Sequence, residues 1–229
     1  MKKTWIVLLG VLSLALTHAA NAQVRNEALA NSIIAARQKN NTMLLQYTWT
    51  AMTSFLKDGN TKDTRIQQVS YTASGVPQYT LINDNAAPMP RGFLRRAIAE
   101  NEKEEAEKYL KGLEKLVGQY TLPGPGAVVN FLSTANITAS TAPDGTAILQ
   151  TTGAGVVVPG DSVTFSYDLG TFAMRQATVT TTFDGHSVTL TATFRTLPSG
   201  LSHLQYATVE VPDKNLTVNI HNYDYVPNN

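Results

Sequence analysis

The chain contains no cysteine at any of its 229 positions. A disulfide framework is therefore excluded, and so is a lipid-modified cysteine of the kind that anchors exported lipoproteins. Charged residues are also scarce, at 15% of the chain, where an average globular protein has about 25%. A fold of this sequence must therefore be stabilised by burial of apolar side chains, without covalent cross-links.

The chain has no excess of charge of either sign. It carries 18 Lys and Arg against 17 Asp and Glu, and two of the basic residues, Lys2 and Lys3, precede the expected mature chain. Without those two, 16 basic and 17 acidic residues leave a net charge of −1. This balance offers no attraction to nucleic acid or to an anionic membrane surface. We therefore expect no nucleic-acid partner.

Residues typical of catalytic and metal sites are few. The expected mature chain has three histidines, at positions His186, His203 and His221. None has the spacing of a metal site, and the sequence lacks a GxSxG nucleophile elbow and a phosphate loop with its lysine. We therefore expect a non-enzymatic protein without catalytic residues, metal or cofactor. The weaker alternative, a hydrolase, would need a nucleophile and a carboxylate near His203, which leucines flank.

The longest apolar run, Trp5–Leu16, lies at the N-terminus. Lys2 and Lys3 precede it and the small residues 20–22 follow it, which is the pattern of a secretory signal peptide. We predict a signal over residues 1–22, cleaved after Ala22. The run is too short to remain as a membrane span, and no later segment is longer, so the mature chain should lack a transmembrane segment. The expected location is the periplasm or the medium.

The remaining sequence alternates between helical and strand patterns. An amphipathic helix is predicted from Val24 to about Asn40, ended by Asn40 and Asn41. Three strands follow, and then a helical insertion at about residues 92–135, formed by a long charged helix and a short one. Strands continue to the end. The predicted strands are Met43–Leu56, Thr64–Tyr71, Gln78–Ile82, Ala147–Thr152, Ser162–Tyr167, Thr171–Thr182, Ser187–Arg195, His203–Val211 and Leu216–Tyr225.

The strongest local signal is a hairpin between residues 171 and 195. From Ser187 to Arg195, apolar and polar residues alternate, which places Val188, Leu190 and Phe194 on one face of a strand. Asp184 and Gly185 connect this strand to the preceding one. That dipeptide favours a type I′ turn, because both central residues of the turn need positive φ.

The apolar strand face has two interpretations. It is either the filled core beneath the helices or the wall of a ligand cavity. Eight or nine strands present more apolar surface than two or three helices can cover, and large curved sheets do enclose ligand cavities. The candidate cavity residues are Phe165, Tyr167, Phe172, Met174, Val188, Leu190, Phe194, Val218 and Ile220.

The order of elements resembles the outer-membrane lipoprotein carrier superfamily (LolA/LolB-like). The local match runs from Phe165 through Arg175 and the Asp184-Gly185 turn to Phe194. A group of uncharacterised exported bacterial proteins is similar over most of the mature chain. The shared segments are residues 91–95 (Arg-Gly-Phe-Leu-Arg), 160–162 (Gly-Asp-Ser) and 222–225 (Asn-Tyr-Asp-Tyr). The Arg-Pro strand of the carriers has no counterpart between Thr64 and Ile82, so no functional residue is carried over.

This resemblance implies an α+β fold over residues 23–229: a curved antiparallel sheet of about 8–10 strands, forming a half-open β-barrel covered by two or three helices. It also implies a periplasmic protein that binds a lipid or acyl chain in the half-barrel, with lipid or lipoprotein carriage as a related role. The alternative function is an interaction or sensor module with a packed core that recognises an envelope protein.

Overall fold

The computed structural model describes residues 26–72, 74–84, 93–121 and 124–228. The predicted signal peptide and most of the irregular loop predicted after Asn83 lie outside the described residues. The helices are an N-terminal helix over residues 26–44, α2 (Phe93–Thr121) and α3 (Pro125–Thr134), with a 3-10 turn η1 (Pro212–Lys214). The strands are β1 (Tyr47–Lys57), β2 (Asn60–Tyr71), β3 (Pro77–Asp84), β4 (Asn136–Thr141), β5 (Ala147–Ala154), β6 (Ser162–Asp168), β7 (Met174–Phe183), β8 (His186–Thr196), β9 (Ser202–Val211) and β10 (Leu216–Pro227).

All ten strands form one sheet in the order β3-β2-β1-β10-β9-β8-β7-β6-β5-β4. Every neighbouring pair is antiparallel, and all but one join strands that follow each other in the chain. The exception is β1 with β10, which brings the first and last strands together in the middle of the sheet. The edges β3 and β4 stay apart. The predicted α+β fold with a half-open barrel is confirmed.

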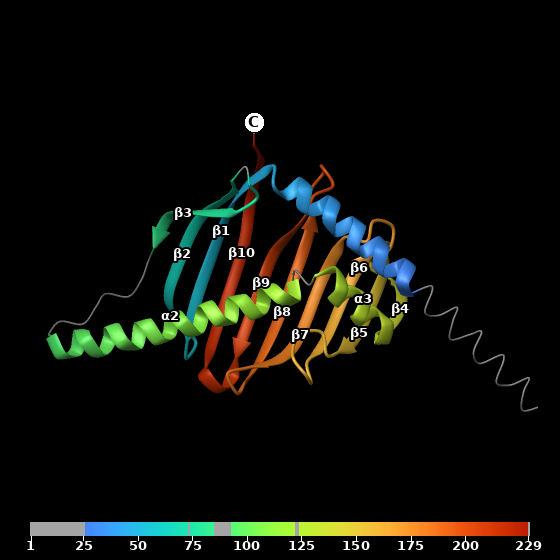
Figure 1. Cartoon of the computed structure of the whole chain (residues 1–229). Helices are drawn as coiled ribbons and strands as arrows, with labels where there is room; N and C mark the ends of the chain where they lie inside the picture. Colours follow the sequence, from blue (N-terminus) through green and yellow to red (C-terminus); the bar gives the residue numbers. More distant parts are fainter. Residues whose placement is uncertain (1–25, 73, 85–92, 122–123, 229) are drawn as a thin grey trace, which may run out of the picture.

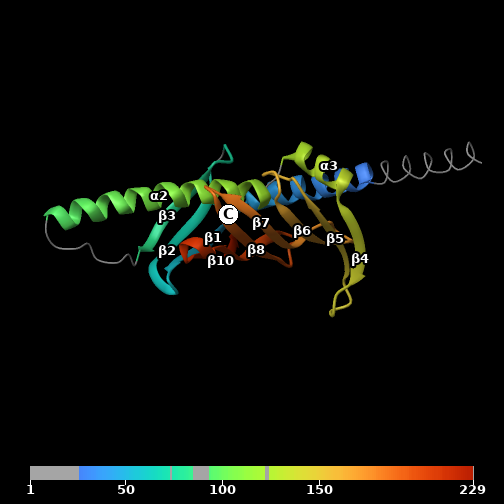
Figure 2. The ribbon, with the colours of Figure 1, turned by 90° about the horizontal axis from the view of Figure 1, so that it is seen from below.

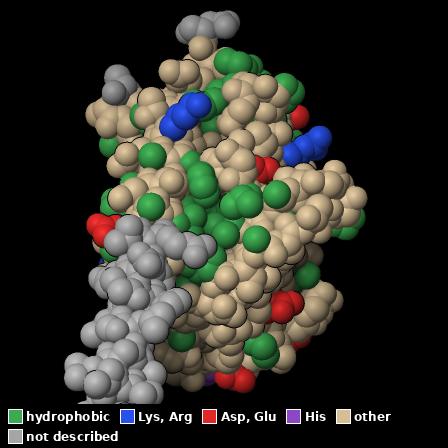
Figure 3. All heavy atoms as spheres, turned by 90° about the vertical axis from the view of Figure 1, so that its right-hand side faces the viewer, with side chains coloured by type: hydrophobic (Ala, Val, Ile, Leu, Met, Phe, Trp, Pro, Cys, Tyr) green, Lys and Arg blue, Asp and Glu red, His purple; other side chains and the backbone are tan. Residues whose placement is uncertain are grey.

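The sheet curves into a trough, and the helices lie across its open side (Figures 1 and 2). In Figure 1, α2 crosses the middle of the strands, whereas the N-terminal helix and α3 lie over the half that ends in β4. From the β4 side, hydrophobic side chains gather at the centre of the visible surface (Figure 3). Two of the three described helices therefore lie over the half of the sheet that ends in β4.

The β7–β8 hairpin forms as predicted. Asp184 and Gly185 have φ angles of 52° and 77°, the two positive values that a type I′ turn requires. Across the pair, Val179 lies opposite Leu190, and both are at most 1% exposed. The inward-facing residues of β7 and β8 around this pair are therefore fully buried in the centre of the sheet.

The N-terminal helix is longer than predicted, and its expected end at Asn40 and Asn41 is wrong. It continues to residue 44, and β1 begins only at Tyr47. The side chain of Asn40 instead makes two tertiary hydrogen bonds. Its amide donates to the Ser202 carbonyl (2.8 Å) and its oxygen accepts from the Ser202 amide (2.7 Å). These bonds fasten the helix to the start of β9, so a residue typical of a helix end serves here as an anchor.

The structure differs from the prediction at two further places, the start of β7 and the strand β4. β7 begins at Met174 and not at Thr171, because Asp168 organises a turn by accepting hydrogen bonds from the amides of Gly170 and Thr171. Phe172 lies in that turn with a φ of 55°. β4 was not predicted at all. Its sequence, Asn-Ile-Thr-Ala-Ser-Thr, is mostly exposed and lacks the apolar alternation that indicates a half-buried strand.

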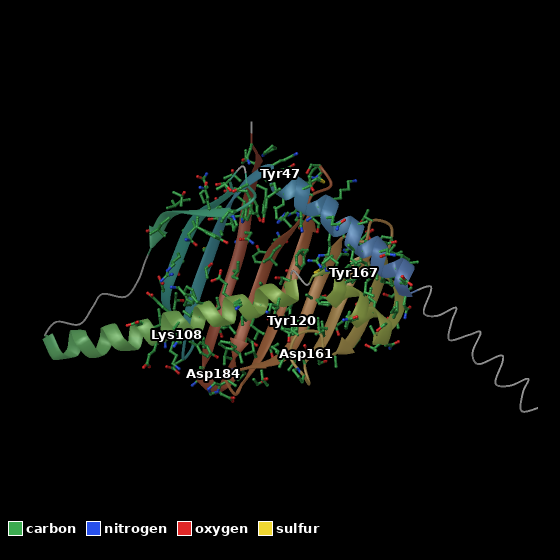
Figure 4. The ribbon with its side chains drawn as sticks, in the orientation of Figure 1. Tyr47, Lys108, Tyr120, Asp161, Tyr167 and Asp184 are labelled. Carbon is green, nitrogen blue, oxygen red and sulfur yellow. The ribbon has the colours of Figure 1, made fainter. Side chains whose placement is uncertain are left out.

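A buried carboxylate joins the end of α2 to the sheet. Asp161, 2% exposed, accepts hydrogen bonds from the four consecutive amides of residues 155–158. The Tyr120 hydroxyl donates to the same carboxylate at 2.8 Å (Figure 4). Burial tends to raise the pKa of Asp161, but these hydrogen bonds outweigh it and lower the pKa. Burial also raises the pKa of Tyr120, to about 12. The loop, the helix and β6 are therefore held at one point.

Candidate ligand-binding groove

The two halves of the trough differ in how fully they are filled. In the packed half, β5 to β9, the inward side chains are buried beneath the helices. In the open half, β1, β2, β3 and β10, the described apolar side chains that reach full burial are Tyr47, Val69 and Val218. The inward positions of β1 are half-buried for most of its length. The space for a ligand therefore lies over the open half.

That space is a groove of about 430 Å³ between α2 and the open half, within the roughly 300–1,000 Å³ typical of small-molecule sites. Its floor comes from β1, β2 and β10 together with one residue of the adjoining strand β9, and its wall comes from α2. The floor residues are Thr53, Phe55, Arg65, Gln67, Val209, Val218 and Ile220. The wall residues are Glu107, Leu110, Lys111, Leu113, Glu114 and Val117.

The pairing of β1 with β10 creates the apolar floor. Phe55 lies opposite Val218, and Thr53 lies opposite Ile220. Because side chains alternate between the faces of a strand, these two rows share the inward face. Phe55 comes from the start of the described chain and Val218 from its end, so the floor exists only after these two segments have met.

The wall follows from the period of α2. Leu110, Leu113 and Val117 are three and four residues apart and therefore lie on one stripe of the helix. Leu113 is 2% exposed, whereas Leu110 and Val117 are half-buried along the groove. Glu107 and Glu114, at the same spacing, place carboxylates on the rim. The wall is thus apolar towards the sheet and charged towards water, where Lys111 lies between the two glutamates.

Arg65 forms the opposite rim from β2. Its guanidinium donates to the Asp63 carboxylate at 3.0 Å and lies 5.7 Å above the centre of the Phe55 ring. Since a cation over a ring face is attracted by the ring quadrupole, this contact holds the arginine along the groove. The result is an apolar floor between charged rims, a surface suited to an apolar ligand with one polar end.

The predicted cavity residues fall into three places. Phe165, Tyr167, Val188 and Leu190 are buried in the packed half, at 1–4% exposure. Val218 and Ile220 line the groove. Phe172, Met174 and Phe194 line a separate hollow of about 260 Å³ beside the N-terminal helix. The structure therefore brings two of the nine residues to the groove and separates the other seven from it.

An aromatic cluster lies near the start of β1 and the end of β10. Trp49 stacks on Tyr225 with ring centres 5.3 Å apart, and Tyr71 lies 5.8 Å from Trp49. His203 packs 4.0 Å from the Tyr225 ring. Burial raises the pKa of Tyr225 and lowers that of His203, so both side chains are neutral at neutral pH. The cluster is therefore an uncharged group of packed rings outside the groove lining.

The hydrolase alternative depended on His203. Its Nδ1 lies 3.2 Å from the Leu204 carbonyl oxygen. Among the described residues, no hydrogen bond joins its ring to a carboxylate or to a hydroxyl nucleophile. The same part of the chain holds no cluster of three or more potential metal ligands. None of its helices combines the length and apolarity needed to cross a bilayer.

No protein-family model matches the chain, and no curated protein matches it. Among solved structures, it is similar to a DUF1329 family protein from Desulfovibrio piger, with 11% identity, a TM-score of 0.38 and coverage of 88% of this chain and 92% of that one. A LolA superfamily protein from Nitrosomonas europaea is similar with 11% identity, a TM-score of 0.35 and coverage of 84% and 93%. One of these two structures is thus described as a member of the superfamily that the sequence resembles.

Several groove residues were not among the predicted candidates. The apolar ones are Phe55, Leu110, Leu113, Val117 and Val209. Their signals were present in the sequence, as the alternation around Phe55 and the helical stripe of Leu110, Leu113 and Val117. What the sequence did not reveal is that β1 pairs with β10 and that α2 lies over that pair. The site therefore depends on long-range pairing.

Proposed function

We propose that this protein is a non-enzymatic periplasmic protein that binds a lipid or acyl chain in the groove beneath α2. The observation that carries the proposal is the apolar floor of the open half, which the helices leave partly uncovered. Phe55, Val218 and Ile220 form a continuous inward surface across β1 and β10. Uptake and delivery of such a chain, as lipid or lipoprotein carriage, is the role that this groove would serve.

The energetics favour a chain of about a dozen carbons. Each buried methylene contributes about 0.8 kcal/mol, so twelve contribute about 10 kcal/mol before the costs of ordering are subtracted. A micromolar dissociation constant corresponds to about 8 kcal/mol. One acyl chain therefore supports binding of micromolar affinity at most once those costs are subtracted, and such reversible binding suits a carrier better than permanent retention does.

The first test uses the protein purified from its native host. We expect mass spectrometry of an organic extract to find a co-purifying lipid at a defined ratio to protein. The delipidated protein should then take up a fluorescent fatty acid with micromolar affinity. A protein that is free of lipid on purification and also takes up no fatty acid would contradict the proposal.

The second test places a charge in the groove. Ile220→Asp puts a carboxylate on the apolar floor and should weaken fatty-acid binding by at least about tenfold, because an unpaired charge there disfavours an apolar neighbour. Asn219→Asp is the matched control, since residue 219 is adjacent, exposed and on the opposite face of β10. Thr53→Phe, which fills the groove without adding charge, should also reduce binding. Equal binding by all variants and the wild type would place the ligand elsewhere.

A second function, recognition of a partner protein, is favoured by one corner of the molecule. Five large apolar side chains are 43–59% exposed around the edge strand β3: Leu45, Val76, Tyr79, Leu81 and Ile82. An edge strand also presents unpaired backbone groups. A Leu81→Lys variant that lost an envelope partner in a pull-down, with unchanged fatty-acid uptake, would support this function separately from lipid binding.

A further inference from the structure

A second hollow of about 820 Å³, here called the mouth, adjoins the groove near the β7–β8 turn and η1. Two of its lining residues, Lys108 and Asp184, are labelled in Figure 4. Its apolar lining is Tyr109, Leu110, Phe183 and Leu216, with Ala106 at the margin. Its charged lining is Lys57, Lys108, Lys214, Glu105 and Asp184. The mouth therefore combines an apolar base with a majority of ammonium groups.

The mouth and the groove adjoin each other on the two sides of one residue. Leu110 lines both of them. On the sheet, Lys57 lies opposite Leu216, one inward-facing step beyond the pair formed by Phe55 and Val218. A chain lying in the groove along these strands would therefore place one of its ends in the mouth.

Two of the lysines are held in place by contacts of their own. The Lys57 ammonium group donates a hydrogen bond to the Lys214 carbonyl oxygen. The Lys214 ammonium group lies 4.8 Å from the centre of the Tyr109 ring. Asp213, the neighbour of Lys214, lies 3.6 Å from His186. Within the described part of the chain, none of the three mouth lysines forms an ion pair with a carboxylate.

Tyr109 adds an unused polar group. Its hydroxyl is buried and has no hydrogen-bond partner among the described residues. Burial raises the pKa of Tyr109, and the nearby Asp184 raises it further, so the hydroxyl keeps its proton at neutral pH. A buried donor without a partner is destabilising. A ligand oxygen bound in the mouth would satisfy it if the side chains that cover the hydroxyl shift on binding.

We propose that the mouth binds the anionic headgroup, a carboxylate or a phosphate, of a single-chain amphiphile whose alkyl chain lies in the groove. An oxyanion accepts hydrogen bonds from Tyr109 and from the lysines at the same time, whereas a cationic headgroup has no acceptor to offer. Three ammonium groups against the carboxylates of Glu105 and Asp184 favour the same charge. This inference rests on the proposed function.

The test compares headgroups on one chain length. Isothermal titration of the mature protein uses dodecanoate, dodecyl phosphate and dodecyltrimethylammonium, each below its micelle concentration. We expect at least one anionic ligand to bind about tenfold more tightly than the ammonium ligand, with the gap narrowing as salt screens the exposed lysines. The ratio between carboxylate and phosphate distinguishes a fatty acid from a phosphorylated lipid as the source.

Variants assign the preference to the mouth. Tyr109→Phe keeps the ring and removes the hydroxyl, so it should weaken anionic binding by about fivefold to tenfold without lowering the melting temperature. Replacing Lys57, Lys108 and Lys214 together by Gln should remove the preference for anions. Lys115→Gln is the control, because this exposed lysine lies on α2 outside the mouth. It should leave all three affinities unchanged.

The outcomes separate this inference from the proposed function. If all three ligands bind equally to the wild type, the chain is bound but the headgroup assignment is wrong. If none of them binds, the groove itself does not take an alkyl chain and both proposals are wrong. If Tyr109→Phe or the triple lysine variant keeps the full preference for anions, the headgroup lies outside the mouth.

Discussion

The packed half and the open half of the sheet both have apolar side chains on their inward face, but the two faces differ in how fully they are covered. Leu190 in the packed half and Ile220 in the open half are both apolar, inward-facing strand residues. Leu190 is 1% exposed, whereas Ile220 is only half-buried along the groove. The difference is made by what lies above them. Where helices fill the trough, the apolar face provides stability, and where α2 alone crosses it, the face remains available to a ligand.

The largest predicted effect tests this difference with equivalent truncations. Leu190→Ala should lower the free energy of unfolding by about 2–5 kcal/mol, because it leaves a cavity in a closed core. Ile220→Ala should cost only about 1–2 kcal/mol, because less of its surface is removed from water in the native state. Urea denaturation measures both. Equal losses would mean that the two halves are equally packed and would contradict the comparison.

The next effect concerns Asp161, the carboxylate that joins the end of α2 to the loop before β6. Asp161→Asn replaces one acceptor oxygen by a donor that faces backbone amides, and should cost about 2–3 kcal/mol at neutral pH. Asp161→Asn should still bind fatty acid as tightly as the wild type does, because Asp161 lies outside the groove lining. If Asp161→Asn lost fatty-acid binding under conditions in which it is fully folded, the packed half and the open half would be coupled.

Low pH should destabilise the protein in part through protonation of Asp161. The pKa of Asp161 is lowered in the folded state, where hydrogen bonds outweigh burial. Its contribution to stability is therefore present above about pH 4, the unfolded pKa of an aspartate, and is lost as the pH falls through the lower folded value. The wild type should lose stability over this acidic range more steeply than Asp161→Asn does. Parallel urea midpoints from pH 5 to pH 2 would argue against this role.

A smaller effect tests how closely α2 lies over the sheet. A β-carbon at Gly112 would lie 2.5 Å from the tip of the Phe183 ring, whereas one at Gly118 meets nothing within 4 Å. The Phe183 ring packs with its centre 5.1 Å from that of Tyr109, so admitting the β-carbon would require this ring pair to shift. Gly112→Ala should therefore destabilise the protein by about 1 kcal/mol, the overpacking cost exceeding the gain in helix propensity.

Gly118→Ala is the matched substitution in the same helix and should stabilise the protein by about 0.5–1 kcal/mol, since the helix gains without a clash. Thermal melts of both variants decide the sign. Stabilisation by Gly112→Ala would mean that α2 can move away from the sheet without cost.

The sequence predicted most strands because their apolar residues alternate, and it predicted the Asp184-Gly185 turn because its residues favour positive φ. β4 was missed, since an exposed polar edge strand has no such alternation. The end of the N-terminal helix was misplaced because Asn40 bonds to Ser202, a partner 162 positions away. Local patterns describe elements, but they do not describe which elements meet.

The same limit applies to the site. Phe165 and Ile220 have identical sequence signals, an apolar residue at alternating strand positions. The sequence cannot distinguish core from cavity, because the difference lies in which helix covers each strand. Likewise, the Gly160-Asp161-Ser162 segment was recognised as a recurrent strand start, but the role of Asp161 depends on the loop folding back onto its carboxylate. Tertiary packing determines both.

The most direct test of the central claim is a map of ligand-induced chemical shifts. Dodecanoate would be titrated into the isotopically labelled mature protein and backbone NMR signals followed. We predict shifts concentrated in β1, β2, β10 and residues 107–117 of α2, with the signals of Phe165, Tyr167, Val188 and Leu190 nearly unchanged. Shifts centred on those four residues, or saturable binding with no shift in β1 and β10, would contradict the assignment of the open half as the ligand site.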